Sequence, residues 1–457
     1  MSTSVERDLA RLLGDGGVLP GTAGAYLADA TEGRGVRGRA DAVALPGTAE
    51  EVAAVVAWSY EHDVAIVPRG GGTGFAGGAV PVDGGVVLSL ERLTRTRSLD
   101  PGLWRAEVEA GVTTATVQRR AREEGLFFAV DPGAAEQSQI GGNVATNAGG
   151  PHTFKYGVTG AWVSGLEVVL APGELVRVGG PVRKDVAGYD LRSLLVGSEG
   201  TLGVITAAWL RLLPAPELRL PVAVFYADAD AGCAAIARVL GSGVVPAALE
   251  FLDAGALRAA AGAFPGGVPD GSGFLVLAEA DGAADEARRV HGELGEALAD
   301  GALAVVAPDE LWRWRDGVSP AVSAQRGGKV SEDIAVPVDR LAEAIAETVE
   351  IGARHGLEAL SWGHAGDGNV HSTFLVGRDD APGLDRASAA AQELFALAAR
   401  LGGTVSGEHG IGLVKRGALS LQAPEAVLRL QEDIKRVFDP KGLLNPGKKV
   451  ARPARGE

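Results

Sequence analysis

Residues 68–78 read PRGGGTGFAGG, and this glycine-rich stretch directly follows a predicted strand at residues 64–67 (VAIV). Glycine lets the backbone approach a ligand closely, and successive N–H groups in such a loop form a concave site for an anion. Arg69 adds positive charge beside it. A pyrophosphate is therefore the expected ligand. The stretch lacks the GK[ST] ending of a Walker loop, and the AVPVDG that follows cannot begin the helix of a dinucleotide-binding motif.

Two further glycine-rich stretches follow, at residues 131–150 (DPGAAEQSQIGGNVATNAGG) and 197–206 (GSEGTLGVIT). One such loop alone is equally typical of a mobile hinge. Three hinges in one folded unit would be hard to stabilise, because ordering each residue costs conformational entropy. The second and third stretches also carry polar side chains able to bind a ribityl chain or a ring edge, namely Asn143, Asn147, Ser198, Glu199 and Thr201. Together the stretches favour a ligand-binding function.

The composition excludes several classes of protein. The chain has 67 glycines among 457 residues, roughly twice the ordinary share, without the period of collagen. Its hydrophobic fraction of 46% is too high for a disordered chain. No apolar run reaches the roughly 18 residues that a membrane-spanning helix needs, and the first residues lack the apolar centre of a secretory signal. The length suggests two or three domains.

Charge and cysteine content narrow the function further. The single cysteine, Cys233, excludes an internal disulfide, an iron–sulfur cluster and a structural zinc finger. The net charge of −15 argues against a general affinity for nucleic acid or anionic lipid. We therefore expect a cytoplasmic protein that has no integral membrane segment and binds no nucleic acid.

Secondary-structure signals divide the chain near residues 212–221 (LLPAPELRLP), where three prolines lie in ten positions. Before this boundary a capping box at residues 48–51 predicts the start of a helix. The other predicted elements there are strands at 86–90 and 105–109 and a helix at 114–124.

After the boundary at residues 212–221 we predict strands at 274–280 and 370–375 and helices at 339–354, 387–401 and 424–437. The second half is therefore expected to be α+β, with helices on one face of a largely antiparallel sheet. The expected division is an N-terminal helical segment (1–40), a first domain (41–215) and a second domain (222–450).

Residues 361–374 (SWGHAGDGNVHSTF) contain two histidines, His364 and His371. If residues 367–368 (Asp-Gly) form a type I′ turn, the two histidines lie directly opposite each other on one face of a hairpin. That spacing suits two imidazoles on one divalent ion, and Thr373 would share the face. The alternative is a pair of solvated histidines on an exposed hairpin.

A second candidate lies at residues 406–412 (SGEHGIG), where Glu408 offers a hard oxygen ligand and His409 follows it. In an extended segment the two side chains point in opposite directions. One group could therefore bind a metal while its neighbour faces a substrate as a general base. The alternative is an ordinary polar loop, although the flanking glycines favour a backbone held close to a ligand.

A carboxylate substrate would need a fixed cation. Residues 311–317 (LWRWRDG) supply Arg313 and Arg315, and residues 327–333 (GGKVSED) supply Lys329. Arginine is the better bidentate partner for a carboxylate. For any single arginine or lysine, a surface charge without a binding function is the more frequent case.

Six strings in order resemble the FAD-linked oxidoreductases of the vanillyl-alcohol oxidase type. They are PRGGGTGFAGG, IGGNVATNAGG with KYG, GYDLRSLLVGSEGTLGVIT, GHAGDGNVH, SGEHGIG and FDPKGLLNPGK. The resemblance runs from about residue 40 to 450, nearly the whole chain. It is closer to the branch that holds cytochrome-type D-lactate dehydrogenases, the FAD subunit of glycolate oxidase and D-2-hydroxyglutarate dehydrogenase.

The resemblance implies a two-subdomain FAD-binding domain at 41–215 and a substrate- and metal-binding domain at 222–450. The residues implied to bind FAD are Pro68, Arg69, Gly70, Gly71, Gly72, Thr73, Gly74, Gly77, Gly78, Asp131, Pro132, Gly141, Gly142, Asn143, Asn147, Gly150, Glu199, Gly200, Gly203, Ile205 and Asn445. The implied ligands of a divalent metal, zinc or manganese, are His364, His371 and Glu408. His409 matches the catalytic base of the family, and the implied substrate-binding residues are Arg315, Lys329 and Thr373. The first glycine-rich loop holds no histidine for covalent attachment, so we expect non-covalent FAD.

The expected reaction is oxidation of a small (R)-2-hydroxy acid, D-lactate or glycolate, to the 2-oxo acid, with hydride transfer to flavin N5. D-2-hydroxyglutarate is the alternative substrate, and it would need a second cation from Arg313 or Lys329. Alternatives of another class are a transferase similar to alkylglycerone-phosphate synthase, a flavin-free metallohydrolase and a non-catalytic FAD-binding subunit.

The electron acceptor is open between oxygen, a quinone, a cytochrome, an electron-transfer flavoprotein and a partner subunit. Such a partner could place the protein at the membrane surface.

Overall fold

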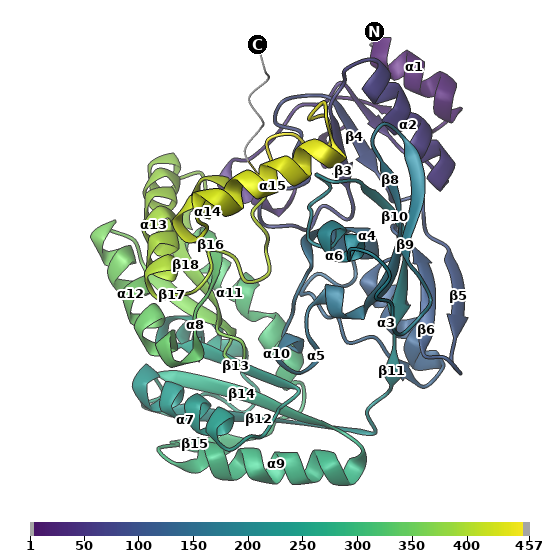
Figure 1. The fold of residues 1–457 in the computed structure, drawn as a ribbon. Coiled ribbons are helices and arrows are strands. Elements are labelled where there is room, and N and C mark those ends of the chain that lie inside the picture. Colours follow the sequence, from purple (N-terminus) through teal and green to yellow (C-terminus); the bar gives the residue numbers. More distant parts are fainter. Residues whose placement is uncertain (1–3, 451–457) are drawn as a thin grey trace. The chain divides into compact units, whose positions relative to one another are not determined.

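The computed structural model describes residues 4–450, and its contacts divide the chain into two compact units. The first unit contains the chain up to Ala148, the stretch Val158–Pro214 and the chain from His409 onward. The second unit contains Gly149–Gly157 and Ala215–Glu408. The chain thus leaves the first unit twice, once for a nine-residue segment and once for the whole second sheet (Figure 1).

The first unit is built on two sheets. One has the order β1-β2-β4-β3, in which β2, β4 and β3 are parallel, and its strands are β1 (Val18–Pro20), β2 (Ala42–Ala44), β3 (Ile66–Arg69) and β4 (Val86–Ser89). The other is antiparallel, β5-β6-β10-β8-β9, with β5 (Thr96–Asp100), β6 (Arg105–Glu109), β8 (Val163–Leu170), β9 (Glu174–Gly179) and β10 (Val204–Arg211). β7 (Leu126–Phe127) pairs with β11 (Leu213–Pro214). These two sheets correspond to the two subdomains that the resemblance implies for this part of the chain.

The helices of the first unit are α1 (Ser4–Leu13), α2 (Ala49–Glu61), α3 (Thr114–Glu123), α4 (Ile140–Thr146), α6 (Leu191–Leu195), α14 (Leu419–Gln422) and α15 (Glu425–Phe438). The start of α2 confirms the predicted capping box. The Thr48 hydroxyl accepts a hydrogen bond from the Glu51 N–H at 3.1 Å, and the Glu51 carboxylate accepts one from the Gly47 N–H at 2.6 Å. Val52, Val55 and Val56 of α2 are buried in the core of this unit.

The second unit is a seven-stranded, wholly antiparallel sheet with the order β15-β12-β14-β13-β17-β18-β16. Its strands are β12 (Leu218–Tyr226), β13 (Ala248–Asp253), β14 (Phe274–Gly282), β15 (Ala304–Val306), β16 (Gly327–Ala335), β17 (Ala359–His364) and β18 (Asn369–Gly377). Its helices are α5 (Thr153–Tyr156), α7 (Ala229–Gly241), α8 (Ala254–Ala260), α9 (Ala284–Ala299), α10 (Leu311–Asp316), α11 (Val318–Ala324), α12 (Leu341–Arg354) and α13 (Ala381–Arg400). The α+β class predicted from the sequence is confirmed.

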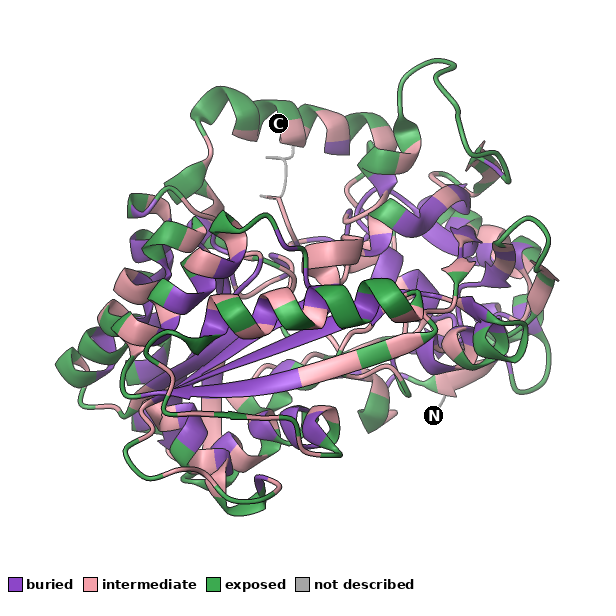
Figure 2. Ribbon diagram, turned by 90° about the horizontal axis from the view of Figure 1, so that it is seen from below, coloured by how far each residue is buried: buried purple, intermediate pink, exposed green. Residues whose placement is uncertain are grey.

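Helices cover both faces of this sheet, so the prediction of helices on one face is wrong. The long helices α7, α9, α12 and α13 pack on one face, where the Tyr226 hydroxyl donates to the Leu298 carbonyl of α9 at 2.6 Å. The short helices α8, α10 and α11 pack on the other, where Leu257 and Val318 share a core with Leu275 of β14. Figure 2 shows the resulting pattern: the strands are mostly buried, and the helices are buried along one side.

Asp253 fixes the middle of this sheet. Its carboxylate accepts a hydrogen bond from the Ala256 N–H at 2.8 Å, which caps α8, and another from the Ser361 N–H of β17 at 2.6 Å. Burial raises the pKa of this carboxyl group to about 6. One side chain thereby ties the end of β13 to β17, the two strands that carry the site described below.

A charged cluster in the first unit spans its antiparallel sheet from β5 to β8. Arg97 of β5 donates to Glu167 of β8 at 2.8 Å and to Glu107 of β6 at 3.2 Å. Glu109 and Glu167 are buried. Burial alone would raise the pKa of Glu167, but the hydrogen bonds and charge of Arg97 hold it below its ordinary value of 4.5. The ionised carboxylates therefore stabilise the fold above pH 4.5, and this contribution is lost as the pH falls further.

We expect Arg97→Ala to lower the free energy of unfolding by about 2–3 kcal/mol at neutral pH, because it removes the cation that the buried carboxylates of Glu109 and Glu167 share. The difference from wild type should shrink below pH 4.5, where the carboxylates become protonated. Denaturant titration at several pH values measures both effects. Arg354→Ala is the control, since its pair with Glu393 is exposed and surface ion pairs contribute little to stability. Equal effects of the two substitutions at neutral pH would contradict this assignment.

Candidate active site

Two glycine-rich stretches of the first unit lie against each other, backbone to backbone. A Cβ atom on Gly71 would lie 2.1 Å from the Gln137 carbonyl oxygen, and one on Gly70 would lie 3.3 Å from the backbone of Gly142. Glycine is therefore required where the loop after β3 meets the start of α4. In contrast, a Cβ atom on Gly74 would meet nothing within 4 Å, so open space lies beside the same loop.

The third stretch joins this loop to the C-terminal segment. Glu199 has a left-handed backbone (φ 55°), and its carboxylate accepts hydrogen bonds from the N–H groups of Ile411 at 2.9 Å and Gly412 at 2.6 Å. The Asn445 side-chain amide donates to the carbonyl oxygens of Gly78 at 2.9 Å and Glu199 at 2.7 Å. These bonds bring the first and third stretches and the C-terminal segment into one cradle.

The cradle fits a ligand with polar edges. Three buried side-chain oxygens around it make no hydrogen bond within the described part of the chain: Gln139 Oε1, Ser198 Oγ and Asn445 Oδ1. Buried polar atoms are ordinarily paired, so orphaned oxygens beside open backbone loops indicate a missing partner. The ribityl hydroxyl and ring N–H groups of FAD would donate to the amide oxygens, and its oxygen atoms would accept from Ser198.

Other predicted FAD residues are occupied by contacts within the protein. Arg69 donates to the carbonyl oxygens of Ala28 at 2.7 Å and Ala25 at 2.9 Å. Asn143 donates to Thr114 at 2.6 Å, and the Asn147 side chain accepts from the Gly160 N–H. These three side chains therefore shape the loops.

The remaining predicted FAD residues fall on or beside the same loops. Pro68 lies in β3, Gly141 and Gly142 lie in α4, and Ile205 lies in β10. Between named elements lie Gly72, Thr73, Gly77, Asp131, Pro132, Gly200 and Gly203. Gly150 is counted with the second unit, where its N–H donates to the Thr153 hydroxyl at 2.9 Å.

In the second unit, β17 and β18 form the predicted hairpin, but in another register. His364 pairs with Asn369, and His371 pairs with Trp362. The expected type I′ turn needs positive φ at both central residues, whereas Gly368 has it (φ 76°) and Asp367 does not. A longer loop results, so the two histidines are diagonal neighbours on one face, with ring centroids 5.2 Å apart.

Three candidate metal ligands converge at this hairpin. Nε2 of His364 lies 3.5 Å from Glu408 Oε1, and Nε2 of His371 lies 3.4 Å from the same oxygen. The donor atoms of all three residues lie within 4.8 Å of one another, and both imidazoles are buried. Two imidazoles and one carboxylate are a donor set that suits zinc or manganese.

Sequence reasoning missed two buried carboxylates that accept hydrogen bonds from members of this cluster. Glu250 of β13 accepts from His364 Nδ1 and from Arg315, whose Nε lies 2.8 Å from Glu250 Oε2. Asp333 of β16 accepts from the Glu408 N–H at 2.6 Å. Acidic residues within strands, in ALEFLD of β13 and GGKVSEDIA of β16, are the sequence signal that could have found them.

The charges of the cluster depend on one another. Burial alone would raise the pKa of Glu250, but His364 and Arg315 lower it to about 2. Burial would lower the pKa of His364, whereas the carboxylates of Glu250 and Glu408 raise it well above 6.5. Glu250 is therefore ionised at neutral pH.

The structure separates the predicted substrate residues. Arg315 is buried in the second unit, whereas the side chain of Arg313 is 85% exposed and paired with Glu310. Lys329 donates to the Ser319 hydroxyl at 2.6 Å and lies over the Trp362 ring, and burial lowers its pKa to about 8.

Thr373 and Asn369 share the sheet face of the histidines. The hydroxyl oxygen of Thr373 lies 2.8 Å from that of Ser331. Asn369 is buried, and its Oδ1 atom makes no hydrogen bond within residues 4–450. Sequence reasoning overlooked Asn369, although its place two residues before His371 puts it on the same face.

His409 follows Glu408 and belongs to the first unit, where its ring lies 4.8 Å from that of Phe75. The exposed Phe75 lies in the first glycine-rich loop. The predicted base is therefore held beside the loop that is expected to bind the cofactor.

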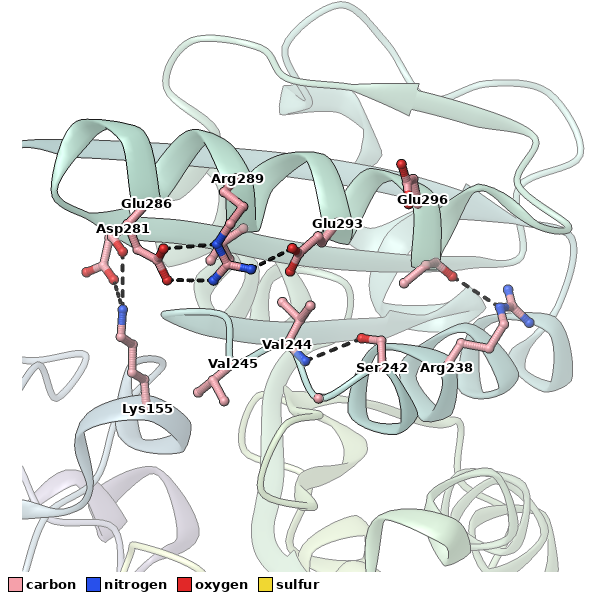
Figure 3. Close-up of a pocket in the computed structure, with 13 residues that line it drawn as sticks. Lys155, Arg238, Ser242, Val244, Val245, Asp281, Glu286, Arg289, Glu293 and Glu296 are labelled. Carbon is pink, nitrogen blue, oxygen red and sulfur yellow. Dashed lines mark hydrogen bonds and ion pairs between the residues drawn. The ribbon is translucent and has the colours of Figure 1, made fainter.

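A surface pocket of the second unit lies between α7, α9 and the segment around Lys155 (Figure 3). Its charges are paired: Lys155 contacts Asp281 at 2.5 Å, and Arg289 contacts Glu286 at 2.7 Å and Glu293 at 2.5 Å. Paired groups of this kind leave little charge to attract a ligand.

No helix within residues 4–450 is long and apolar enough to cross a membrane.

Comparison with known proteins agrees with this architecture. Residues 40–179 match the FAD binding domain, and residues 215–449 match the C-terminal domain of FAD linked oxidases. The chain is 36% identical to glycolate oxidase subunit GlcD of Bacillus subtilis, over 91% of this chain and 90% of that protein. It is 37% identical to a D-lactate dehydrogenase of Archaeoglobus fulgidus (90% and 91%) and 35% identical to a D-2-hydroxyglutarate dehydrogenase of Xanthomonas citri pv. viticola (89% and 88%).

Solved structures show the same fold at lower identity. p-Cresol methylhydroxylase superposes with a TM-score of 0.82 at 19% identity, over 100% of this chain and 99% of that one. Alkyldihydroxyacetonephosphate synthase gives 0.77 at 17% identity, over 96% and 84%. The glycine cradle, the antiparallel sheet and these matches lead to one conclusion: the chain belongs to the family of FAD-linked oxidases.

Proposed function

We propose that this FAD-linked oxidoreductase oxidises a small (R)-2-hydroxy acid, D-lactate or glycolate, to the corresponding 2-oxo acid. The convergence of His364, His371 and Glu408 on one point carries the proposal. Relatives at 35–37% identity are named for glycolate, D-lactate and D-2-hydroxyglutarate, all of them 2-hydroxy acids. A hydroxyl and a neighbouring carboxylate form a chelating pair, and a divalent ion on these three ligands would bind such a pair.

Arg315 is the proposed anchor for the substrate carboxylate. Glu250 engages its Nε and Nη2 atoms, whereas Nη1 makes no hydrogen bond within the described residues. A guanidinium group has five N–H donors, so part of its edge remains for a second carboxylate. Thr373 and Asn369 are the proposed partners of the remaining substrate oxygens.

His409 is the proposed general base, which would take the proton of the substrate hydroxyl. FAD held in the glycine cradle would supply the hydride acceptor for the carbon that bears this hydroxyl. His364, His371 and Glu408 would hold a divalent ion, which would supply a Lewis acid for the hydroxyl. The protein residues then contribute position and charge: Arg315 fixes the carboxylate, and His409 holds the proton.

D-2-hydroxyglutarate is the second candidate substrate. Its distal carboxylate needs another cation, and Arg313 is paired with Glu310 at the surface. Lys329 therefore remains as the partner for that carboxylate, although Ser319 already accepts its hydrogen bonds. A transferase function similar to alkyldihydroxyacetonephosphate synthase has the shared fold in its favour, at 17% identity.

The proposed acceptor is a quinone, a cytochrome, a flavoprotein or a partner subunit, since the lone cysteine excludes an iron–sulfur cluster within this chain. We propose the cytoplasm as the location, in keeping with the acidic composition.

Anaerobic mixing of the FAD-loaded protein with single substrates tests the proposal. Glycolate, both lactates and both 2-hydroxyglutarates should be compared by the loss of visible flavin absorbance. D-Lactate or glycolate should bleach the flavin fastest, and L-lactate should not. Bleaching by none of the five acids would refute the function, and faster bleaching by D-2-hydroxyglutarate would select the second candidate.

We expect His409→Ala to give yellow, FAD-loaded protein that the substrate reduces roughly 10²–10⁴-fold more slowly, because the general base is missing. Stopped-flow absorbance under anaerobic conditions measures the rate. His355→Ala is the control, since that histidine pairs with Glu393 on the outside of the second unit. Retention of the wild-type rate in His409→Ala would remove the base assignment.

His371→Ala should abolish tight binding of zinc or manganese and leave the FAD content unchanged, because FAD and the metal are assigned to separate groups of residues. Metal and flavin content of the purified variant are measured by elemental analysis and absorbance. Concurrent loss of FAD and of the thermal transition would show instead that the histidine has a structural role.

A further inference from the structure

Glu250 is a fully buried carboxylate at the centre of the sheet face that carries the metal cluster. It lies on β13 directly opposite His364 on β17, and its exposed fraction is 0%. An ionised carboxylate at such a position is strongly destabilising unless hydrogen-bond donors satisfy its oxygens. The burial of Glu250 therefore requires hydrogen-bond donors that offset its energetic cost, or a function that accounts for it.

Each oxygen of Glu250 contacts a different functional group. Oε1 accepts from Nδ1 of His364, and Oε2 accepts from Nε and Nη2 of Arg315. The first bond holds a proton on Nδ1, so Nε2, which lies 3.5 Å from Glu408 Oε1, is the ring atom available to a metal. The second bond fixes the plane of the guanidinium group.

We propose that Glu250 is a positioning residue that fixes the tautomer of His364 for metal binding and orients Arg315 for the substrate carboxylate. This inference rests on the proposed metal site and extends it, because one buried side chain would set both metal affinity and carboxylate binding. Carboxylates behind histidine ligands hold the ring orientation and increase its basicity. The same carboxylate neutralises Arg315, which is itself buried.

The sheet offers a matched comparison in Glu279 of β14. This carboxylate is equally buried and shares the sheet face of Glu250, since Glu250 pairs with Leu277 and Glu279 lies two residues further along β14. Its partners are His152 at 3.0 Å and the Trp312 indole N–H. Glu279 therefore carries the same burial cost without contacting a metal ligand.

The test compares Glu250→Gln with Glu279→Gln in the full-length, FAD-loaded protein. Zinc affinity is measured by chelator competition without substrate, and the visible spectrum is recorded after cobalt substitution. We expect Glu250→Gln to weaken zinc binding roughly 10–100-fold and to change the cobalt spectrum. It should also raise KM for the substrate, whereas Glu279→Gln should leave zinc affinity and the cobalt spectrum as in wild type.

Zinc affinity of Glu250→Gln within twofold of that of Glu279→Gln would overturn the inference. If Glu250→Gln alone does not fold, the double variant Glu250→Gln, Arg315→Met removes the buried pair together and carries the same prediction for zinc. Because zinc affinity is measured without substrate, this result is independent of which acid is oxidised. Failure of the hydroxy-acid proposal would appear instead as unbleached flavin in a metal-loaded protein.

Discussion

The hydrogen-bonded group Glu250, His364 and Arg315 is the constraint on which the second unit depends. One face of its antiparallel sheet carries apolar residues under α8, α10 and α11, and it also carries the charged cluster. Buried charges are tolerated only as partners of one another, so β13 and β17 must pair in one register. A slip of one residue would turn His364 to the opposite face.

The first unit meets a different constraint, the close approach of its own backbone. The Gly71 position lies against the Gln137 carbonyl, and Gly412 lies against Ala76, so larger residues would force the loops apart. Some of the glycines are thus explained because one loop packs directly against another. Others, such as Gly74, border open space beside the same loops. Both features belong to the same cradle, which also holds the orphaned oxygens of Gln139, Ser198 and Asn445.

Much of the fold follows from local patterns. The predicted helix at 114–124 is α3 (Thr114–Glu123), and the predicted strand at 105–109 is β6 (Arg105–Glu109), because capping residues and apolar periodicity act locally. The helices on the second face of the sheet were missed because α8, α10 and α11 are too short, at 7, 6 and 7 residues, to show a periodic signal. The hairpin register was missed because it depends on the loop conformation after Ala365.

The site residues could be predicted where they lie in one contiguous motif. They could not be predicted where only the pairing of distant strands brings them together. His364 and His371 are seven residues apart, and their shared face follows from strand alternation. Glu250 lies 114 residues from His364, and only the pairing of β13 with β17 brings them together. Arg315 was singled out for the substrate, whereas its bond to Glu250 also makes it part of the support behind the metal ligands.

In the proposed reaction, flavin reduction by a 2-hydroxy acid depends on the metal cluster. The most direct measurement is the anaerobic rate of flavin bleaching by D-lactate or glycolate in protein stripped of metal by a chelator, before and after zinc or manganese is restored. We expect the stripped protein to keep its FAD and not to be bleached, and we expect the restored ion to return the reaction. Equally fast bleaching of the stripped protein would contradict this expectation.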